Sequence, residues 1–208
     1  MVSALVFAIV ATAPAQTLGY KKLVFDDFTQ GPYMLTLTGE TSQSHAWHNL
    51  DRSHVAFGDR LTYLQINNNP QSAALTLVIG DGVERLSSPV QVAWHFFTQW
   101  GNDGTVELDL SNVGQFVADL SKVPDQTSVV MLDKNGSITS NGFWLLRNGG
   151  IYFRRTDFSG SFDWKHVRTV QFKQDFSSLP NPLVYTLTSF YATLKPVAIP
   201  PAPRVKHR

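Results

Sequence analysis

The sequence predicts an all-β protein in which two antiparallel sheets pack against each other as a sandwich. Many short runs of this 208-residue chain are rich in valine, isoleucine, threonine and aromatic residues, which favour strands. Glycine, asparagine, aspartate and proline separate these runs, as is typical of turns. The separators recur roughly every ten to fourteen residues, a spacing that indicates a sandwich or barrel. We find no convincing helical stripe of apolar residues between Leu23 and Leu194.

The expected strands follow one another along the chain with turn sequences between them. They are 23–28, 33–39, 45–50, 61–67, 74–80, 90–97, 106–110, 116–120, 128–132, 142–147, 151–158, 167–176 and 184–194. The turns are expected at 67–70, 80–82, 101–104, 133–136 and 148–150, where asparagine, aspartate, glycine and proline cluster.

Alternation of apolar and polar residues predicts which face of each strand is buried. In 90–97 one face carries Val90, Val92, Trp94 and Phe96, and the other carries Gln91, Ala93, His95 and Phe97. The strand 74–80 has one face with Leu75, Leu77 and Ile79 and the other with Thr76 and Val78. The strand 167–176 has Val170 and Phe172 on one face and Gln171 and Lys173 on the other. One wet face per sheet is typical of antiparallel sheets, and two such sheets can share one core.

Composition and charge bound the possible functions. Charged residues are only 16% of the chain and hydrophobic residues 43%, which excludes disorder and a coiled coil. The net charge is +1, and all the charges after Leu194 are basic. The remaining chain therefore has a small excess of acids and no basic stripe of the kind that nucleic-acid binding needs. No stretch before Lys195 resembles a linker, so we expect one domain at 16–194.

The two ends of the chain differ from its body. Residues 1–15 are uncharged, mostly apolar and end in Ala13-Pro14-Ala15, so we interpret them as a secretory signal peptide, although a basic residue near Met1 is missing. A buried first strand or helix is the alternative. Residues 195–208 hold four of the eleven prolines and predict an extended basic tail. The protein is therefore expected to be secreted or periplasmic, and with no cysteine it has no disulfide framework.

Short motifs resemble those of secreted bacterial β-sandwich proteins. The motifs are Phe25-Asp26-Asp27-Phe28, Phe57-Gly58-Asp59-Arg60, and a late block with Asp157-Phe158, Phe162-Asp163-Trp164, Val167, Val170 and Phe172. Proteins with this pattern often carry PEP-CTERM sorting tails, which this chain lacks after Leu194. The resemblance implies a jelly-roll sandwich of galactose-binding or lectin-like type, and it brings no catalytic residues with it.

Exposed tryptophans beside polar residues are the candidate ligand-binding positions. Sugars present both apolar and polar faces, so aromatic rings with neighbouring amides and acids suit them. We expect Trp100, Asn102 and Asp103 at a loop tip to bind a ligand, together with Trp164 and Trp47. Each of these tryptophans could instead fold back onto the core.

Calcium is the expected cofactor, if there is one, since jelly-roll modules often bind it structurally. The oxygen ligands available are the carboxylates of Asp26, Asp27, Asp163 and Asp175. Such an ion would join the first strand to the last segments of the chain. The alternative is that these aspartates form turns and face solvent.

The leading hypothesis is a non-enzymatic domain that binds a cell-surface or extracellular component, with a glycan as the main candidate. No nucleophile elbow and no phosphate-binding glycine loop occurs in the sequence, so we name no catalytic residue. The rival hypotheses are a polysaccharide-acting hydrolase or lyase, which needs a pair of carboxylates, and a structural subunit that assembles through strand edges or the tail.

Overall fold

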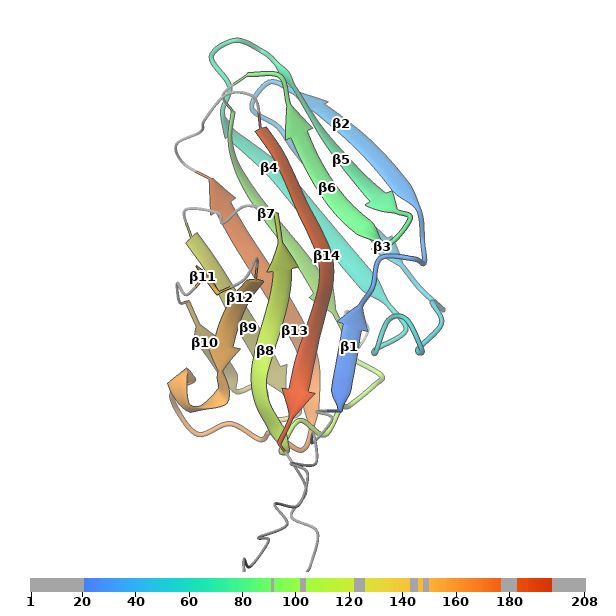
Figure 1. The fold of residues 1–208 in the computed structure, drawn as a ribbon, viewed down its shortest axis with the longest axis vertical. Coiled ribbons are helices and arrows are strands. Elements are labelled where there is room, and N and C mark those ends of the chain that lie inside the picture. Colours follow the sequence, from blue (N-terminus) through green and yellow to red (C-terminus); the bar gives the residue numbers. More distant parts are fainter. Residues whose placement is uncertain are drawn as a thin grey trace, which may run out of the picture.

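The chain folds into two antiparallel sheets that pack face to face (Figure 1). The computed structural model describes residues 21–90, 92–101, 104–121, 126–142, 146–147, 150–176 and 183–195. Within these ranges there are fourteen strands and one short 3₁₀ helix, Arg155–Asp157. The predicted all-β sandwich is therefore confirmed.

The larger sheet has eight strands. Its order is β11 (Leu146–Arg147), β12 (Gly150–Arg154), β8 (Val113–Leu120), β14 (Leu183–Leu194), β6 (Val83–Ser88), β5 (Ala74–Gly80) and β2 (Tyr33–Thr38), and β1 (Lys22–Asp26) also pairs with β14. The smaller sheet has six strands. Its order is β10 (Ile138–Asn141), β9 (Gln126–Asp133), β13 (Val167–Phe176), β7 (Ala93–Trp100), β4 (Arg60–Asn68) and β3 (Ser42–Trp47).

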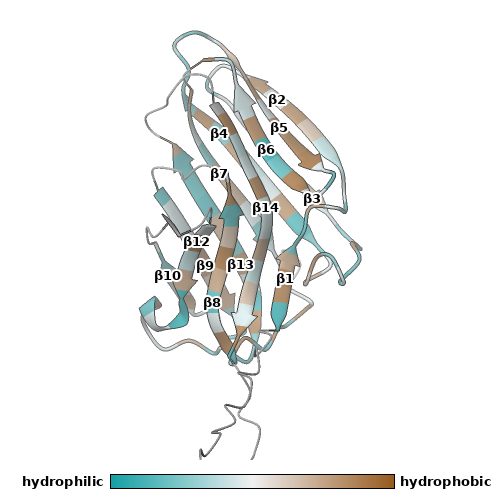
Figure 2. Cartoon of the chain, in the orientation of Figure 1, coloured by the Kyte–Doolittle hydropathy of each residue, from teal (hydrophilic) through white to brown (hydrophobic). Residues whose placement is uncertain are grey.

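The core lies between the sheets and is strongly aromatic. The predicted inward residues of β7 and β13 are buried, and Phe172 of β13 stacks on Phe190 of β14 with ring centroids 5.2 Å apart. Trp94 of β7 similarly meets Tyr185 of β14 at 6.0 Å. Apolar positions recur along the strands of both sheets (Figure 2). Two-residue alternation therefore gives each sheet one face for the shared core.

A buried ion pair connects the two sheets at one end of this core. Arg60 of β4 donates from Nε and Nη2 to the two carboxylate oxygens of Asp26, each at 2.6 Å, and both side chains are fully buried. The indole Nε1 of Trp100 donates to the same carboxylate at 2.8 Å. The motifs 25–28 and 57–60 noted in the sequence therefore lie together in the fold, and their residues Asp26 and Arg60 connect the two sheets.

Most predicted strands are confirmed, with several differences. The strand predicted over 45–50 lies at Ser42–Trp47, and of the strand predicted over 142–147 the structure describes as strand only β11, Leu146–Arg147. The stretch 106–110 forms only an isolated bridge, between Leu108 and Val167, because it runs along the end of β13 and then turns. Strands β6 and β10 were not predicted, because their inward faces include Glu84 and Thr139, which are polar although buried. The strand predicted over 151–158 ends at Arg154, where the 3₁₀ helix begins.

The signal peptide predicted at 1–15 lies outside the described residues, as does the predicted tail except for Lys195. In the part of the chain that is described, no helix is long and apolar enough to span a membrane.

Candidate functional site

The outer face of the six-stranded sheet gathers aromatic and polar side chains from three neighbouring strands. Strand register places Tyr63 of β4 opposite Phe97 of β7, and Phe97 opposite Lys173 of β13. We call this surface the β4–β7–β13 face. It consists of Leu61, Tyr63, Gln65, His95, Phe97, Gln99, Gln171, Lys173 and Asp175, all of them partly exposed.

An aromatic pair forms the centre of this face. The rings of Tyr63 and Phe97 stack with their centroids 5.1 Å apart and their planes at 17°. The Tyr63 hydroxyl donates a hydrogen bond to Oε1 of Gln65 at 2.9 Å, which fixes the orientation of the phenol. Because both rings point away from the core and remain partly exposed, they form an apolar platform on the outside of the sheet.

Hydrogen-bonding side chains lie on both sides of the aromatic pair. On one side Nε2 of Gln171 donates to Oε1 of Gln99 at 3.2 Å. On the other side Nδ1 of His95 is hydrogen-bonded to Oδ1 of Asp175. The imidazole lies edge-on to both platform rings, 6.2 Å from Tyr63 and 6.1 Å from Phe97.

This geometry leaves polar atoms available beside the platform. Nδ1 of His95 is bonded to Asp175, so the other ring nitrogen, Nε2, is the one that can hydrogen-bond a ligand. The carbonyl oxygen of the Gln171 amide can accept a hydrogen bond, and the Lys173 ammonium adds donors. The face thus combines an apolar surface with flanking donors and acceptors, which suits a ligand that has both characters.

Trp100 does not occupy the exposed loop tip that the sequence predicted. It is the last residue of β7 and is fully buried. Its ring stacks on Phe190 at 5.0 Å, and its Nε1 is hydrogen-bonded to Asp26. The prediction was wrong because β7 extends three residues beyond Phe97, which was its expected end, so Trp100 still belongs to the strand. Asn102 and Asp103 lie outside the described residues.

The other two predicted tryptophans are half-buried and have different neighbours. Trp47 ends β3, where the Arg60 guanidinium lies 5.2 Å from its ring centre and the His45 ring lies 4.4 Å away. Trp164 packs edge-on to Phe162, and the Arg155 guanidinium lies 4.6 Å from its ring centre. Ligand binding at Trp47 and Trp164 stays a prediction.

The four aspartates predicted as calcium ligands each have a partner of their own. Asp26 binds Arg60, Asp27 binds His54, Asp163 binds His166, and Asp175 binds His95. Partial burial raises the pKa of Asp27, but hydrogen bonds from Thr29 and His54 outweigh it and hold the pKa below its usual range. Among the described residues, no group of three or more such side chains could hold a metal ion together.

A structural calcium ion therefore stays a prediction, and metal removal tests it. If calcium joins the chain ends, the chelator EDTA should lower the melting temperature, and added Ca²⁺ but not Mg²⁺ should restore it. An unchanged melting temperature in EDTA would contradict the prediction.

Reasoning from the sequence had not selected the β4–β7–β13 face, although one signal for it was present. Phe97 alternates with the core residues Trp94 and Phe96 and shares the solvent-facing side of its strand with His95. A large aromatic residue on the solvent-facing side of a strand indicates a binding surface. The neighbours of Phe97 on β4 and β13 could not be identified, because strand pairing is not readable from one sequence.

The chain was compared with known proteins. No protein-family model and no curated protein matches it. Among solved structures it is similar to the family 11 carbohydrate-binding module of the cellulase Lic26A-Cel5E of Clostridium thermocellum, with 12% identity and a TM-score of 0.40 over 86% of this chain and 96% of that one. It is also similar to the xylan-binding module CBM86 of Roseburia intestinalis, with 13% identity and a TM-score of 0.38 over 74% and 96%. A third is tailspike protein 4 of bacteriophage CBA120, with 11% identity and a TM-score of 0.34 over 82% of this chain and 20% of that one.

Proposed function

We propose that this protein binds a neutral carbohydrate chain on the β4–β7–β13 face and leaves the chain chemically unchanged. The observation that carries the proposal is the partly exposed, stacked pair Tyr63–Phe97 with hydrogen-bonding side chains on both sides. The hydrophobic first fifteen residues of the sequence add the proposal that the protein acts outside the cytoplasm.

A sugar ring matches this surface chemically. Its C–H face packs on an aromatic ring, while its hydroxyls point sideways and both donate and accept hydrogen bonds. Tyr63 and Phe97 supply the packing surface, and the Gln171 amide, Lys173 and His95 supply partners for hydroxyls. Neighbouring strands in a sheet lie about 4.8 Å apart, so three strands present a surface that is wide enough for more than one ring.

The charge of the face favours a neutral ligand. Of the residues that define it, Lys173 is the one cation and Asp175 the one anion. A polyanion such as nucleic acid needs several cations along its path. The single carboxylate also favours binding over hydrolysis, because glycoside hydrolases use two carboxylates about 5 Å or about 6.5–9.5 Å apart.

Removing either platform ring should weaken binding to a soluble polysaccharide. We expect Tyr63→Ala and Phe97→Ala each to raise Kd about tenfold or more, equivalent to about 1.4 kcal/mol, because each loses the packing surface under a sugar ring. Titration calorimetry with xylan, mixed-linked β-1,3-1,4-glucan and other neutral polysaccharides measures this. Among the solved structures similar to this chain, one is a xylan-binding module and another is a family 11 module in complex with a β-1,3-1,4-mixed-linked tetrasaccharide, which guides the choice of the first two probes.

Tyr152→Ala is the matched control, since Tyr152 is a partly exposed aromatic residue on β12 of the other sheet. Its affinity should equal that of the unchanged protein. Equal losses in all three variants, or binding that survives the double variant Tyr63→Ala/Phe97→Ala, would contradict the proposal. Release of reducing sugar would support the hydrolase instead, and mass that rises with concentration in solution scattering would support the assembly subunit.

A further inference from the structure

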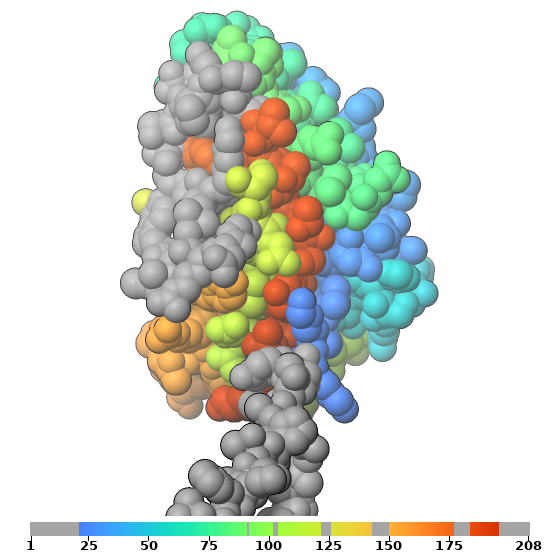
Figure 3. Space-filling view, in the orientation of Figure 1, coloured from blue at the N-terminus to red at the C-terminus, as the bar shows by residue number. Residues whose placement is uncertain are grey.

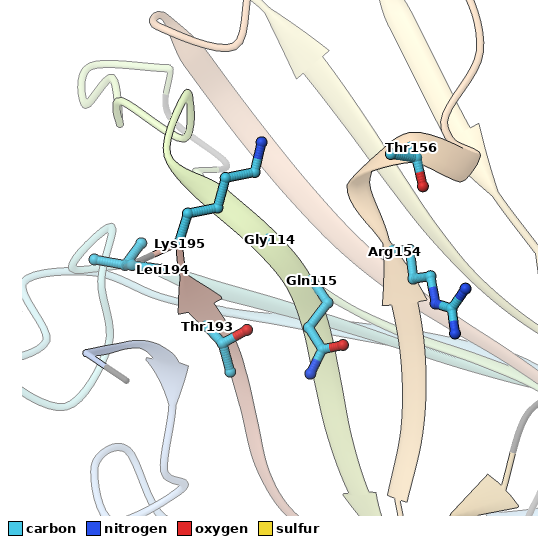
Figure 4. Close-up of a pocket in the computed structure, with 7 residues that line it drawn as sticks. All are labelled: Gly114, Gln115, Arg154, Thr156, Thr193, Leu194 and Lys195. Atoms are coloured by element: carbon cyan, nitrogen blue, oxygen red, sulfur yellow. The ribbon is translucent and has the colours of Figure 1, made fainter. Parts of the chain in front are cut away.

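A pocket opens on the other sheet, at one end of its outer face. It lies where β8, β12 and β14 run side by side and has a volume of about 420 Å³. Figure 3 views this side of the molecule, with β8 in yellow-green beside β14 in red. The lining residues, drawn in Figure 4, are Gly114, Gln115, Arg154, Thr156, Thr193, Leu194 and Lys195. This volume falls within the range of small-molecule sites.

Strand register and one bulge create the pocket. Gln115 of β8 pairs with Thr193 of β14 on one side and with Arg154 of β12 on the other, so these three side chains form a row across the sheet. Next to this row the β8–β14 register shifts, and Gly114 is the extra residue on β8. A bulge of this kind disrupts the ladder locally. A glycine there leaves the space beside Thr193 unfilled.

The pocket is lined by cations and neutral donors. Arg154 and Lys195 are exposed, and neither makes an ion pair with any residue that the structure describes. Figure 4 shows Arg154 on the strand next to Gln115, and Lys195 on the other side with its ammonium extending away from the Gln115 amide. The described lining residues include no carboxylate. The nearby carboxylate of Asp157 accepts a hydrogen bond from the Thr156 hydroxyl at 3.1 Å.

These groups suit an anion that carries its charge on two or three oxygens. A guanidinium binds a carboxylate or sulfate through parallel hydrogen bonds, while an ammonium acts as a point charge. Gln115 and Thr193 add neutral donors to the same lining. The pocket is larger than the anionic group itself needs and has room for the molecule that carries this group.

We propose that this pocket binds an acidic sugar unit through its carboxylate or sulfate. The anionic part of this proposal stands on the pocket alone, and the sugar part rests on the proposed function. The site lies on the opposite sheet from the β4–β7–β13 face, so the two sites could bind different units of one polysaccharide or two different chains.

The test compares three oligosaccharides of equal length by titration: one with uronic acid units, one with sulfate esters and one neutral. We expect at least one acidic oligosaccharide to bind more tightly than the neutral one, and its affinity to fall as salt is added. Arg154→Gln should then raise Kd for that ligand about tenfold or more. If the uronic acid oligosaccharide binds more tightly, the group recognised is a carboxylate; if the sulfated one does, it is a sulfate.

Two further variants separate the pocket from general surface charge. Arg85→Gln removes an exposed arginine from β6 of the same sheet, outside the pocket lining, and should leave binding unchanged. Gly114→Leu keeps both cations but should fill the pocket and abolish binding, and it introduces no backbone strain because Gly114 does not have a positive φ angle.

The proposal is overturned if acidic oligosaccharides bind no more tightly than the neutral one, or if Arg154→Gln and Gly114→Leu both bind normally. Failure of the proposed function gives a different result. Neutral polysaccharide would then not bind at all, while the acidic oligosaccharide would still bind and depend on Arg154. Thermal unfolding of each variant confirms that it is folded.

Discussion

The variant Arg60→Ala is expected to lose about 3–5 kcal/mol of the free energy of unfolding, because it leaves the carboxylate of Asp26 buried without a counterion. Both carboxylate oxygens now accept from the guanidinium at 2.6 Å, and Asp26 is fully buried. Arg60 also donates to the backbone carbonyl of Gln30 at 2.9 Å. A domain of this kind has about 5–15 kcal/mol in total, so the variant should be close to unfolding at 37 °C.

Urea unfolding measures this loss, and two other variants show its origin. Arg85→Ala removes an exposed arginine and should change the free energy of unfolding by less than about 0.5 kcal/mol. The double variant Asp26→Ala/Arg60→Ala should be more stable than Arg60→Ala, because it leaves no unpaired charge in the core. A loss in Arg60→Ala as small as that in Arg85→Ala would contradict the structural role of the ion pair.

The variant Glu84→Gln is expected to be more stable than the unchanged protein at neutral and alkaline pH. Burial raises the pKa of Glu84 from its usual 4.5 to about 8, despite a hydrogen bond that its Oε2 accepts from Thr98 at 2.7 Å. Its other oxygen has no hydrogen-bond partner among the described residues. The carboxyl group of Glu84 therefore stays protonated in the folded protein at neutral pH.

The sign of the pH dependence follows from these two pKa values. Between pH 4.5 and about 8 the folded state holds the proton on Glu84 and the unfolded state does not. The free energy of unfolding therefore falls as pH rises through this window, by up to about 1.4 kcal/mol per pH unit, and the Glu84 contribution is constant above it. Glutamine has nearly the same shape and does not ionise, so Glu84→Gln should lack this dependence.

Unfolding curves of both proteins from pH 4 to pH 9 test the assignment. The two proteins should have similar stability near pH 4 and differ by a few kcal/mol near pH 9, with Glu84→Gln the more stable. Curves that stay parallel across this range would show that Glu84 ionises normally in the folded protein.

Much of the fold was predictable because strand alternation is local. Along β5, β7 and β13 buried positions alternate with partly exposed ones, and the apolar residues predicted to face the core are buried. Strand β6 was missed because Glu84 and Ser88 occupy two of its inward positions. A buried carboxyl group looks like a surface residue in the sequence, and only the surrounding strands show that it is enclosed.

The candidate site was much less predictable than the fold. Tyr63, Phe97 and Lys173 are far apart in the chain, and strand register alone brings them into one row. Trp100 was preferred because it precedes a glycine-rich turn, but its indole belongs to the buried Asp26–Arg60 cluster. Tryptophan beside a turn is weak evidence for a ligand site, because burying so large a side chain is strongly favourable.

The most direct test of carbohydrate binding on the β4–β7–β13 face is an NMR titration of the ¹⁵N-labelled protein with a soluble neutral oligosaccharide that binds it. The account predicts that the largest amide shift changes occur in β4, β7 and β13, around Tyr63, Phe97 and Lys173. Changes confined to residues 101–104, to the surroundings of Trp164 or to the eight-stranded sheet would contradict it.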